Sequence, residues 1–157
     1  MVDSGQVLVL SDAVVKHIFL HCQSRPGQAE AGGQLFATFE GSTVLVTRAT
    51  GPRKSDHRSR FRFIPHRISE RREIKRLFKA GLHFVGDWHT HPQDVPRPSE
   101  IDLSNITDMF TKSRHGLAGF VMIIAGTVEP PRGLYVSICD ERQCTELVTT
   151  DKLSLVT

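Results

Sequence analysis

Two histidines, His89 and His91, lie two positions apart at the end of a short apolar and aromatic run, residues 83–89. Such a run is typical of a buried strand. Residues i and i+2 of a strand face the same side, so both imidazoles can reach one metal ion. A catalytic zinc site then needs a third protein ligand and an open position for water.

Asp102 is the candidate for this third ligand. Prolines between residues 92 and 98 indicate an irregular loop, and apolar residues at helical spacing from Leu103 to Phe110 predict a helix that starts near Ser99. The loop is long enough to set the first turn of this helix beside the end of the strand. A structural explanation stays open, because Ser followed three residues later by an acidic residue also caps a helix.

A zinc ion bound there would lower the pKa of its water from about 15.7 to roughly 7 and so provide a nucleophile near neutral pH. A carboxylate close to that water would act as general acid and base. The Ser99 hydroxyl is suited to donate a hydrogen bond to the oxyanion that develops during attack. These residue types therefore indicate metal-assisted hydrolysis of an amide bond.

The signature H-[ST]-H-P-x6-S-x-x-D of the JAMM/MPN (JAB) family of zinc peptidases resembles residues 89–92, HTHP, and 99–102, SEID, without a gap. Gly86, Trp88 and Pro98 are similar to residues that often flank it. The resemblance covers nearly the whole chain. It implies an α/β protein of the α+β, cytidine-deaminase-like MPN/JAB fold, in which a mixed, mostly antiparallel sheet is flanked by about three helices.

Members of this family place a catalytic glutamate upstream, in the setting E-x-G-G-x-L, and residues 30–35, EAGGQL, match that setting. The resemblance implies that Glu30 is the general base. Glu40 is the weaker candidate because it lies at the far end of the same expected strand. The ligands implied for one Zn2+ per chain are His89, His91 and Asp102, with Ser99 as the oxyanion donor.

The expected elements alternate between helix and strand. A first helix capped by Ser11 ends before residue 24, and residues 34–40 and 43–47 form a hairpin around Gly41. A second helix spans residues 68–78, and the last clear strands lie at 119–125 and 134–139. This order agrees with the fold that the resemblance implies.

With 157 residues, of which 39% are hydrophobic and 24% charged, the chain is expected to form one domain, residues 1–157. It has no apolar run long enough to span a bilayer, and Met1–Leu10 lacks a basic region before its apolar stretch, so we expect a soluble, cytoplasmic protein. Cys22, Cys139 and Cys144 are expected to be reduced thiols. The remaining histidines, expected in ordinary core or surface roles, are His17, His21, His57, His66, His83 and His115.

Residues 51–80 are strongly basic, with eleven of the twenty Lys and Arg residues against three acidic residues. The simplest interpretation is a solvated helix face. The alternative is that this basic segment binds a partner. An acidic protein partner is favoured over nucleic acid, because no aromatic-interleaved or zinc-finger motif accompanies the charge.

The resemblance is greatest to bacterial ubiquitin-like deconjugases of antiphage operons, the CBASS-associated JAB proteins and the Bil systems. It implies zinc-dependent cleavage after the C-terminus of a ubiquitin-like protein, with E1-like and E2-like operon partners. Three alternatives stay open: a non-catalytic MPN-type scaffold, a JAB peptidase of sulfur-carrier metabolism, and a basic nucleic-acid-binding protein with a structural metal.

Overall fold

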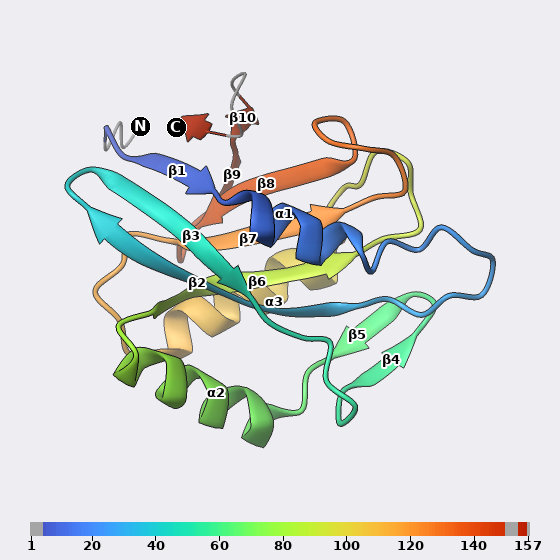
Figure 1. Ribbon diagram of the computed structural model, residues 1–157, viewed down its shortest axis with the longest axis horizontal. Helices are drawn as coiled ribbons and strands as arrows, with labels where there is room; N and C mark the ends of the chain where they lie inside the picture. Colours follow the sequence, from blue (N-terminus) through green and yellow to red (C-terminus); the bar gives the residue numbers. More distant parts are fainter. Residues whose placement is uncertain (1–4, 150–153, 157) are drawn as a thin grey trace.

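The computed structural model describes residues 5–149 and 154–156, which form a nine-stranded sheet, a small hairpin and three helices (Figure 1). The strands of the sheet are β1 Val7–Leu10, β2 Gly32–Glu40, β3 Thr43–Ala49, β6 His83–Thr90, β7 Phe120–Ala125, β8 Leu134–Cys139, β9 Cys144–Glu146, β10 Val148–Thr149 and β11 Ser154–Val156. The hairpin consists of β4 His57–Ser59 and β5 Arg62–Ile64. The helices are α1 Asp12–Phe19, α2 Arg67–Lys79 and α3 Glu100–Lys112.

The strand order in the sheet is β10-β11-β1-β3-β2-β6-β7-β8-β9. Neighbouring strands are antiparallel except for the pairs β1–β3 and β6–β7. The predicted hairpin of residues 34–40 and 43–47 is present as β2 and β3. A mixed, mostly antiparallel sheet flanked by three helices confirms the expected fold class.

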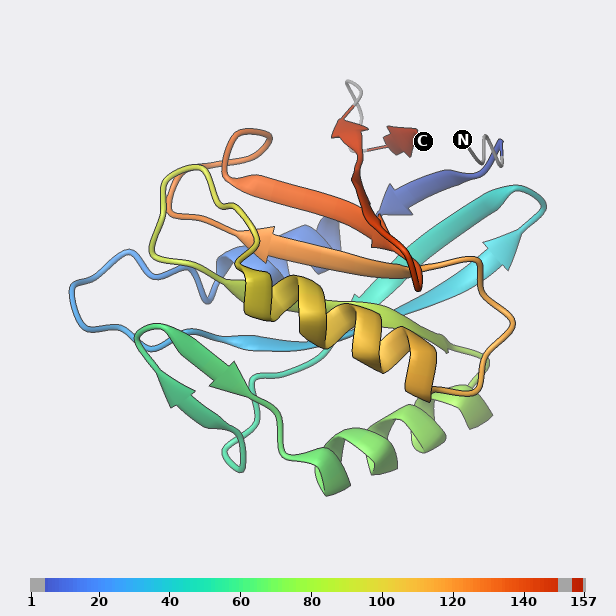
Figure 2. The same ribbon diagram turned by 180° about the vertical axis from the view of Figure 1, so that it is seen from behind.

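Helices α1 and α3 lie on opposite faces of the sheet, with α1 in front in Figure 1 and α3 in front in Figure 2. The α1 face buries Val14 and Ile18 against strands of the sheet. The α3 face buries Ile106 against other side chains of the same strands. Strand β7 is apolar throughout because it contributes to both cores, with all six of its residues buried.

Strand β6 carries a bulge that sets which of its side chains face α3. Its register against β2 slips between the pairs Phe36–Phe84 and Leu35–Gly86, which leaves Val85 as an extra residue. Gly86 has a φ of 147°, and a Cβ there would overlap the backbone of Val121. Beyond the bulge, Trp88 joins the core under α1. The residues on either side of Trp88 therefore point toward α3.

Two features of the chain differ from the sequence-based expectations. Cys139 and Cys144 are joined by a disulfide between β8 and β9, so the expectation of reduced thiols is wrong for this pair, while Cys22 is a free, partly buried thiol. The two cysteines face each other directly across an antiparallel pair of strands. The short strands β1, β4, β9, β10 and β11 were not predicted as separate elements.

Helix α2 is tied to the sheet by polar contacts as well as by the buried Leu77. Glu70 accepts a hydrogen bond from Gln34 of β2 at 3.0 Å and pairs with Arg67 at 2.9 Å. Arg53 contacts both Gln34 and Glu73. Across the described part of the chain, none of the helices has the length and apolar character that crossing a membrane requires.

Candidate metal centre and active site

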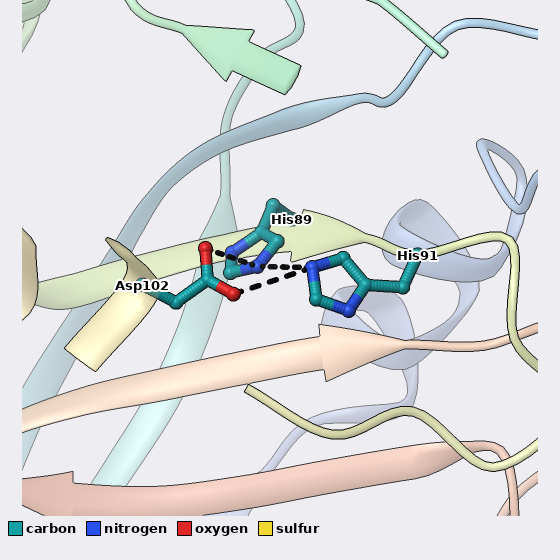
Figure 3. Close-up of side chains that lie close together, drawn as sticks. All are labelled: His89, His91 and Asp102. Carbon is teal, nitrogen blue, oxygen red and sulfur yellow. Dashed lines mark hydrogen bonds and ion pairs between the residues drawn. The ribbon is translucent and has the colours of Figure 1, made fainter. Parts of the chain in front are cut away.

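Side chains from β6, the residue after it and α3 converge at one point of the molecule (Figure 3). His89 Nε2 lies 3.2 Å from His91 Nε2 and 3.3 Å from Asp102 Oδ1, and His91 Nε2 lies 3.4 Å from Asp102 Oδ2. The three side chains are only 12–16% exposed. The structure therefore brings together all three residues that the sequence singled out as ligands.

The spacing of these atoms suits a tetrahedral ion. Zinc with bonds of about 2.0–2.1 Å to nitrogen or oxygen separates neighbouring ligand atoms by about 3.3 Å. The two imidazole nitrogens, 3.2 Å apart, agree with that value, and each lies 3.3 or 3.4 Å from a different oxygen of the Asp102 carboxylate. Among the described residues this is the one cluster of His, Cys, Asp and Glu side chains arranged to hold a metal.

The strand pairing explains why the two imidazoles share a side. His89 pairs with Gly32 of β2, and between the two histidines the backbone N–H of Thr90 donates to the Ala31 carbonyl at 2.9 Å. The Thr90 side chain turns to the other face, where its hydroxyl accepts from the Ala31 N–H at 3.0 Å and donates to Gln23 at 3.2 Å. This buried residue fixes the backbone between the ligands.

Asp102 is held by the capping box of α3. The Ser99 backbone N–H and hydroxyl each donate to Asp102 Oδ2 at 2.7 Å, and the Ser99 hydroxyl accepts from the Asp102 N–H at 3.2 Å. Burial alone would raise the pKa of Asp102, but hydrogen bonds from His89, His91 and Ser99 lower it below its usual range. The structural role of Ser99 as a cap is thus present, and it directs the carboxylate toward the histidines.

Glu30 lies next to this cluster, one step beyond the Ala31–Thr90 contact in the β2–β6 ladder, and is 6% exposed. Burial raises its pKa to about 7, with the charge of His91 opposing the shift and that of Asp102 adding to it. In turn, burial lowers the pKa of His91, but Asp102 and Glu30 raise it overall. The alternative base, Glu40, is exposed at the other end of β2.

The β4–β5 hairpin packs against the Glu30 segment, a contact that the sequence did not suggest. The Glu30 N–H donates to the Ser59 carbonyl at 2.8 Å, and Arg58 Nε donates to the Glu30 carbonyl at 2.6 Å. Gln23 donates to the Arg60 carbonyl at 2.8 Å. Because most of these bonds end on backbone atoms, which every residue type carries, no residue pattern could reveal them.

Gly32 and Gly33 follow Glu30, and each position excludes a larger residue for a different steric reason. A Cβ at Gly32 would lie 2.5 Å from Cδ1 of Phe63, so the aromatic ring of the hairpin rests directly on the strand beside His89. A Cβ at Gly33 would overlap the carbonyl of Thr50. Gly32 and Gly33 therefore allow Phe63 and the Thr50 backbone to pack directly on β2 beside the candidate site.

The remaining histidines lie outside the cluster. His17 and His21 pack their rings against Trp88 on the opposite face of β6, and Trp88 Nε1 donates to the Thr50 carbonyl at 2.9 Å. Burial lowers the pKa of His21, and the neighbouring His17 and Arg58 add to that shift.

The fold and the polar cluster are those expected of a metal-dependent peptidase. A family model described as prokaryotic homologs of the JAB domain matches residues 12–137. The chain belongs to this family of prokaryotic JAB-domain proteins. The family is one of peptidases, typically metal-dependent, so the chain is an enzyme of that class.

Curated relatives carry the name CD-NTase/cGAS isopeptidase. One from Pseudomonas aeruginosa (strain BWHPSA011 / Pa011) is 31% identical over 117 residues, 71% of this chain and 73% of the relative. Another from Escherichia coli (strain TW11681) is 30% identical over 106 residues, 66% of this chain and 68% of the relative. The solution structure of protein DSY2949 from Desulfitobacterium hafniense shares the fold, with a TM-score of 0.64 and 20% identity over 88% of each chain.

Proposed function

We propose that this protein is a zinc-dependent isopeptidase that cleaves after the C-terminus of a ubiquitin-like protein, both in precursors and in conjugates with target lysines. The observation that carries the proposal is the convergence of His89, His91 and Asp102 beside the buried carboxyl of Glu30. Residues 1–157 act as a single catalytic domain in this proposal. One Zn2+ per chain is held by the two imidazoles and the Asp102 carboxylate.

The names of the relatives support a narrower substrate. Several carry the name CD-NTase/cGAS isopeptidase, and we infer from it that the bond cut here joins a modifier to a lysine of a nucleotidyltransferase of that kind. Such a bond requires conjugating enzymes to form it, and E1-like and E2-like proteins of the same antiphage pathway are the proposed partners. The site of action is the cytoplasm.

A zinc ion held by His89, His91 and Asp102 would supply a positive charge that polarises the scissile carbonyl and acidifies water. Glu30, with a pKa of about 7, accepts the proton from the attacking water and then delivers it to the leaving amine. In the metal-free protein burial raises the pKa of this carboxyl to about 7, so the group can take up and release a proton near neutral pH.

Ser99 is the proposed donor to the oxyanion. Its hydroxyl donates to Asp102 Oδ2 at 2.7 Å, and rotation about one side-chain bond redirects that O–H toward the substrate carbonyl. The backbone N–H of Ser99 keeps its own bond to Asp102 during this change. The cap and the catalytic donor are therefore compatible roles of one residue.

The tail of the modifier is proposed to add as a strand to the β4–β5 hairpin, whose two strands form a sheet of their own. Phe63 of the hairpin covers Gly32 beside His89 and narrows the space for the last residues of the tail. This wall favours a tail that ends in residues without bulky side chains.

Two measurements on purified protein test the proposal. Elemental analysis is expected to find one zinc per chain, and a ubiquitin-like protein fused to a reporter is expected to be cut after the modifier's last residue. Glu30→Gln should keep the zinc and lose the cleavage. A wild-type protein that binds zinc but cleaves neither precursor nor conjugate would favour the scaffold alternative instead.

A further inference from the structure

A large groove lies between α2 and α3, on the face of the sheet shown in Figure 2. Its volume is about 860 Å³. It begins at Asn105, one turn of α3 beyond Asp102, and continues to Leu117, after the end of that helix. The groove is thus separate from the metal cluster, although both use α3.

One wall of the groove is a stripe of positive charge on α2. Arg67, Arg71, Lys75 and Lys79 all line it and are spaced four residues apart, so they lie on one side of the helix. Of these four, Arg67 pairs with Glu70, whereas no carboxylate in the described part of the chain pairs with the other three. Like charges at this spacing repel one another.

The opposite wall adds little negative charge to compensate. Asp108 of α3 lines the groove, but it pairs with Lys112, one turn further along the helix. Arg114 follows on the same wall and has no carboxylate partner among the described residues. The groove therefore presents an excess of unneutralised cations to whatever enters it.

The floor of the groove is apolar. Ile74, Phe84 and Met109 are partly buried along it, and Phe120 closes its base. At the rim, Phe78 remains 62% exposed although it is a large hydrophobic side chain. Water covers this apolar surface poorly, so an occupant with apolar side chains of its own gains free energy by displacing it.

We propose that the α2–α3 groove binds an acidic, amphipathic segment of a partner protein. The carboxylates of such a segment pair with Arg71, Lys75 and Lys79, and its apolar side chains cover Phe78 and the floor. Nucleic acid fits less well, because the apolar floor and the exposed Phe78 offer no contacts to its phosphates. The inference rests on the charge and shape of the groove and not on the proposed peptidase activity.

The test uses the full-length protein and a fluorescein-labelled peptide that forms a helix with leucines on one side and glutamates on the other. Its fluorescence anisotropy should rise and saturate as protein is added, and the affinity should fall as salt is raised. The triple variant Arg71→Glu, Lys75→Glu and Lys79→Glu should bind at least about tenfold more weakly. Lys75→Glu alone should show a smaller loss, in case the triple variant is less stable.

A matched control reverses three exposed cations elsewhere, Lys16→Glu, Arg48→Glu and Arg132→Glu. This control has the same net charge as the groove variant and should bind the peptide as the wild type does. A separate variant, Phe78→Ser, should weaken the helical peptide more than a scrambled peptide of the same composition.

Three outcomes would overturn the inference. The first is an equal loss of binding in the groove variant and the control, which would mean non-specific attraction. The second is unchanged binding when the peptide's glutamates are replaced by glutamines. The third is tighter, Phe78-independent binding of a single-stranded thymidine oligonucleotide, which would identify the groove as a nucleic-acid site. None of these readouts depends on cleavage, so they are separable from a failure of the peptidase proposal.

Discussion

The start of α3 and the α2–α3 groove beside its second half differ in how their charged groups are neutralised. At its start, Ser99 and Asp102 exchange hydrogen bonds, and Asp102 faces two imidazoles. Along its second half, the groove shared with α2 holds cations that lack carboxylate partners. The difference agrees with the two proposed roles, because a catalytic site works best when its groups are fixed in advance, whereas a recognition surface keeps charge available for its partner.

If the start of α3 carries the chemistry, removing a ligand should have the largest effect. His89→Ala should lose the metal and reduce cleavage of a ubiquitin-like fusion to the background rate, because two side chains cannot hold the ion in place. Elemental analysis and a cleavage assay measure both. His66→Ala, at an exposed histidine before α2, is the matched control and should keep both properties.

The second-largest effect should come from replacing Glu30, the proposed general base. Glu30→Gln preserves the shape of the side chain but cannot accept a proton, so kcat should fall by about 10²–10⁴ while zinc content stays unchanged. Steady-state kinetics with elemental analysis test this. Glu40→Gln, at the exposed end of the same strand, should leave kcat unaltered. Equal losses in both variants would remove Glu30 from the mechanism.

A smaller effect separates the two roles of Ser99. Ser99→Ala should lower the free energy of unfolding by about 1 kcal/mol through loss of the cap, and should lower kcat by about a hundredfold through loss of the oxyanion donor. Ser11→Ala removes the cap of α1, whose hydroxyl accepts from Val14 N–H at 3.3 Å. It should cost similar stability without any loss of kcat. Denaturant unfolding and kinetics on both variants decide between the roles.

The last effect concerns the pH dependence of stability in the metal-free protein and does not involve catalysis. Folding raises the pKa of Glu30 from 4.5 to about 7, so its contribution to stability is present below pH 4.5 and is lost as the pH rises through 7. Glu30→Gln should match the wild type near pH 4 and exceed it by about 1–3 kcal/mol at pH 8. Urea unfolding at the two pH values measures this difference. If the two proteins differed by the same unfolding free energy at both pH values, the raised pKa of Glu30 would be contradicted.

Much of the fold and all five candidate side chains were accessible from the sequence. The i, i+2 spacing of His89 and His91 predicts a shared side in any strand, and the Ser99–Asp102 spacing predicts a helix start. The structure brings these four residues and Glu30 together, while their roles as ligands, base and oxyanion donor remain predictions. Helices α1, α2 and α3 also follow from their apolar periodicity.

The features that the sequence did not predict depend on contacts between residues that are distant in sequence. Strand β4 has three residues, too few for a period-two pattern, and the hairpin that it forms with β5 is held mainly by backbone bonds around Glu30. The pairing of Cys139 with Cys144 requires β9 to fold back on β8, and nothing in the residues between them specified that turn in advance. Thr90 and Gln23 look like ordinary polar residues until the strand pairing is known.

The bulge at Gly86 has a consequence for the ligands themselves. It shifts the phase of side-chain alternation by one position, so Trp88 enters one core and its two histidine neighbours emerge on the other side. If β6 instead paired with β2 without the bulge, Val85 would lie opposite Leu35, the imidazoles would turn into the packing under α1, and the indole would lie where the histidines are. The HTHP run supplies the donors, but the bulge that takes one upstream residue out of the pairing keeps them on the side of α3.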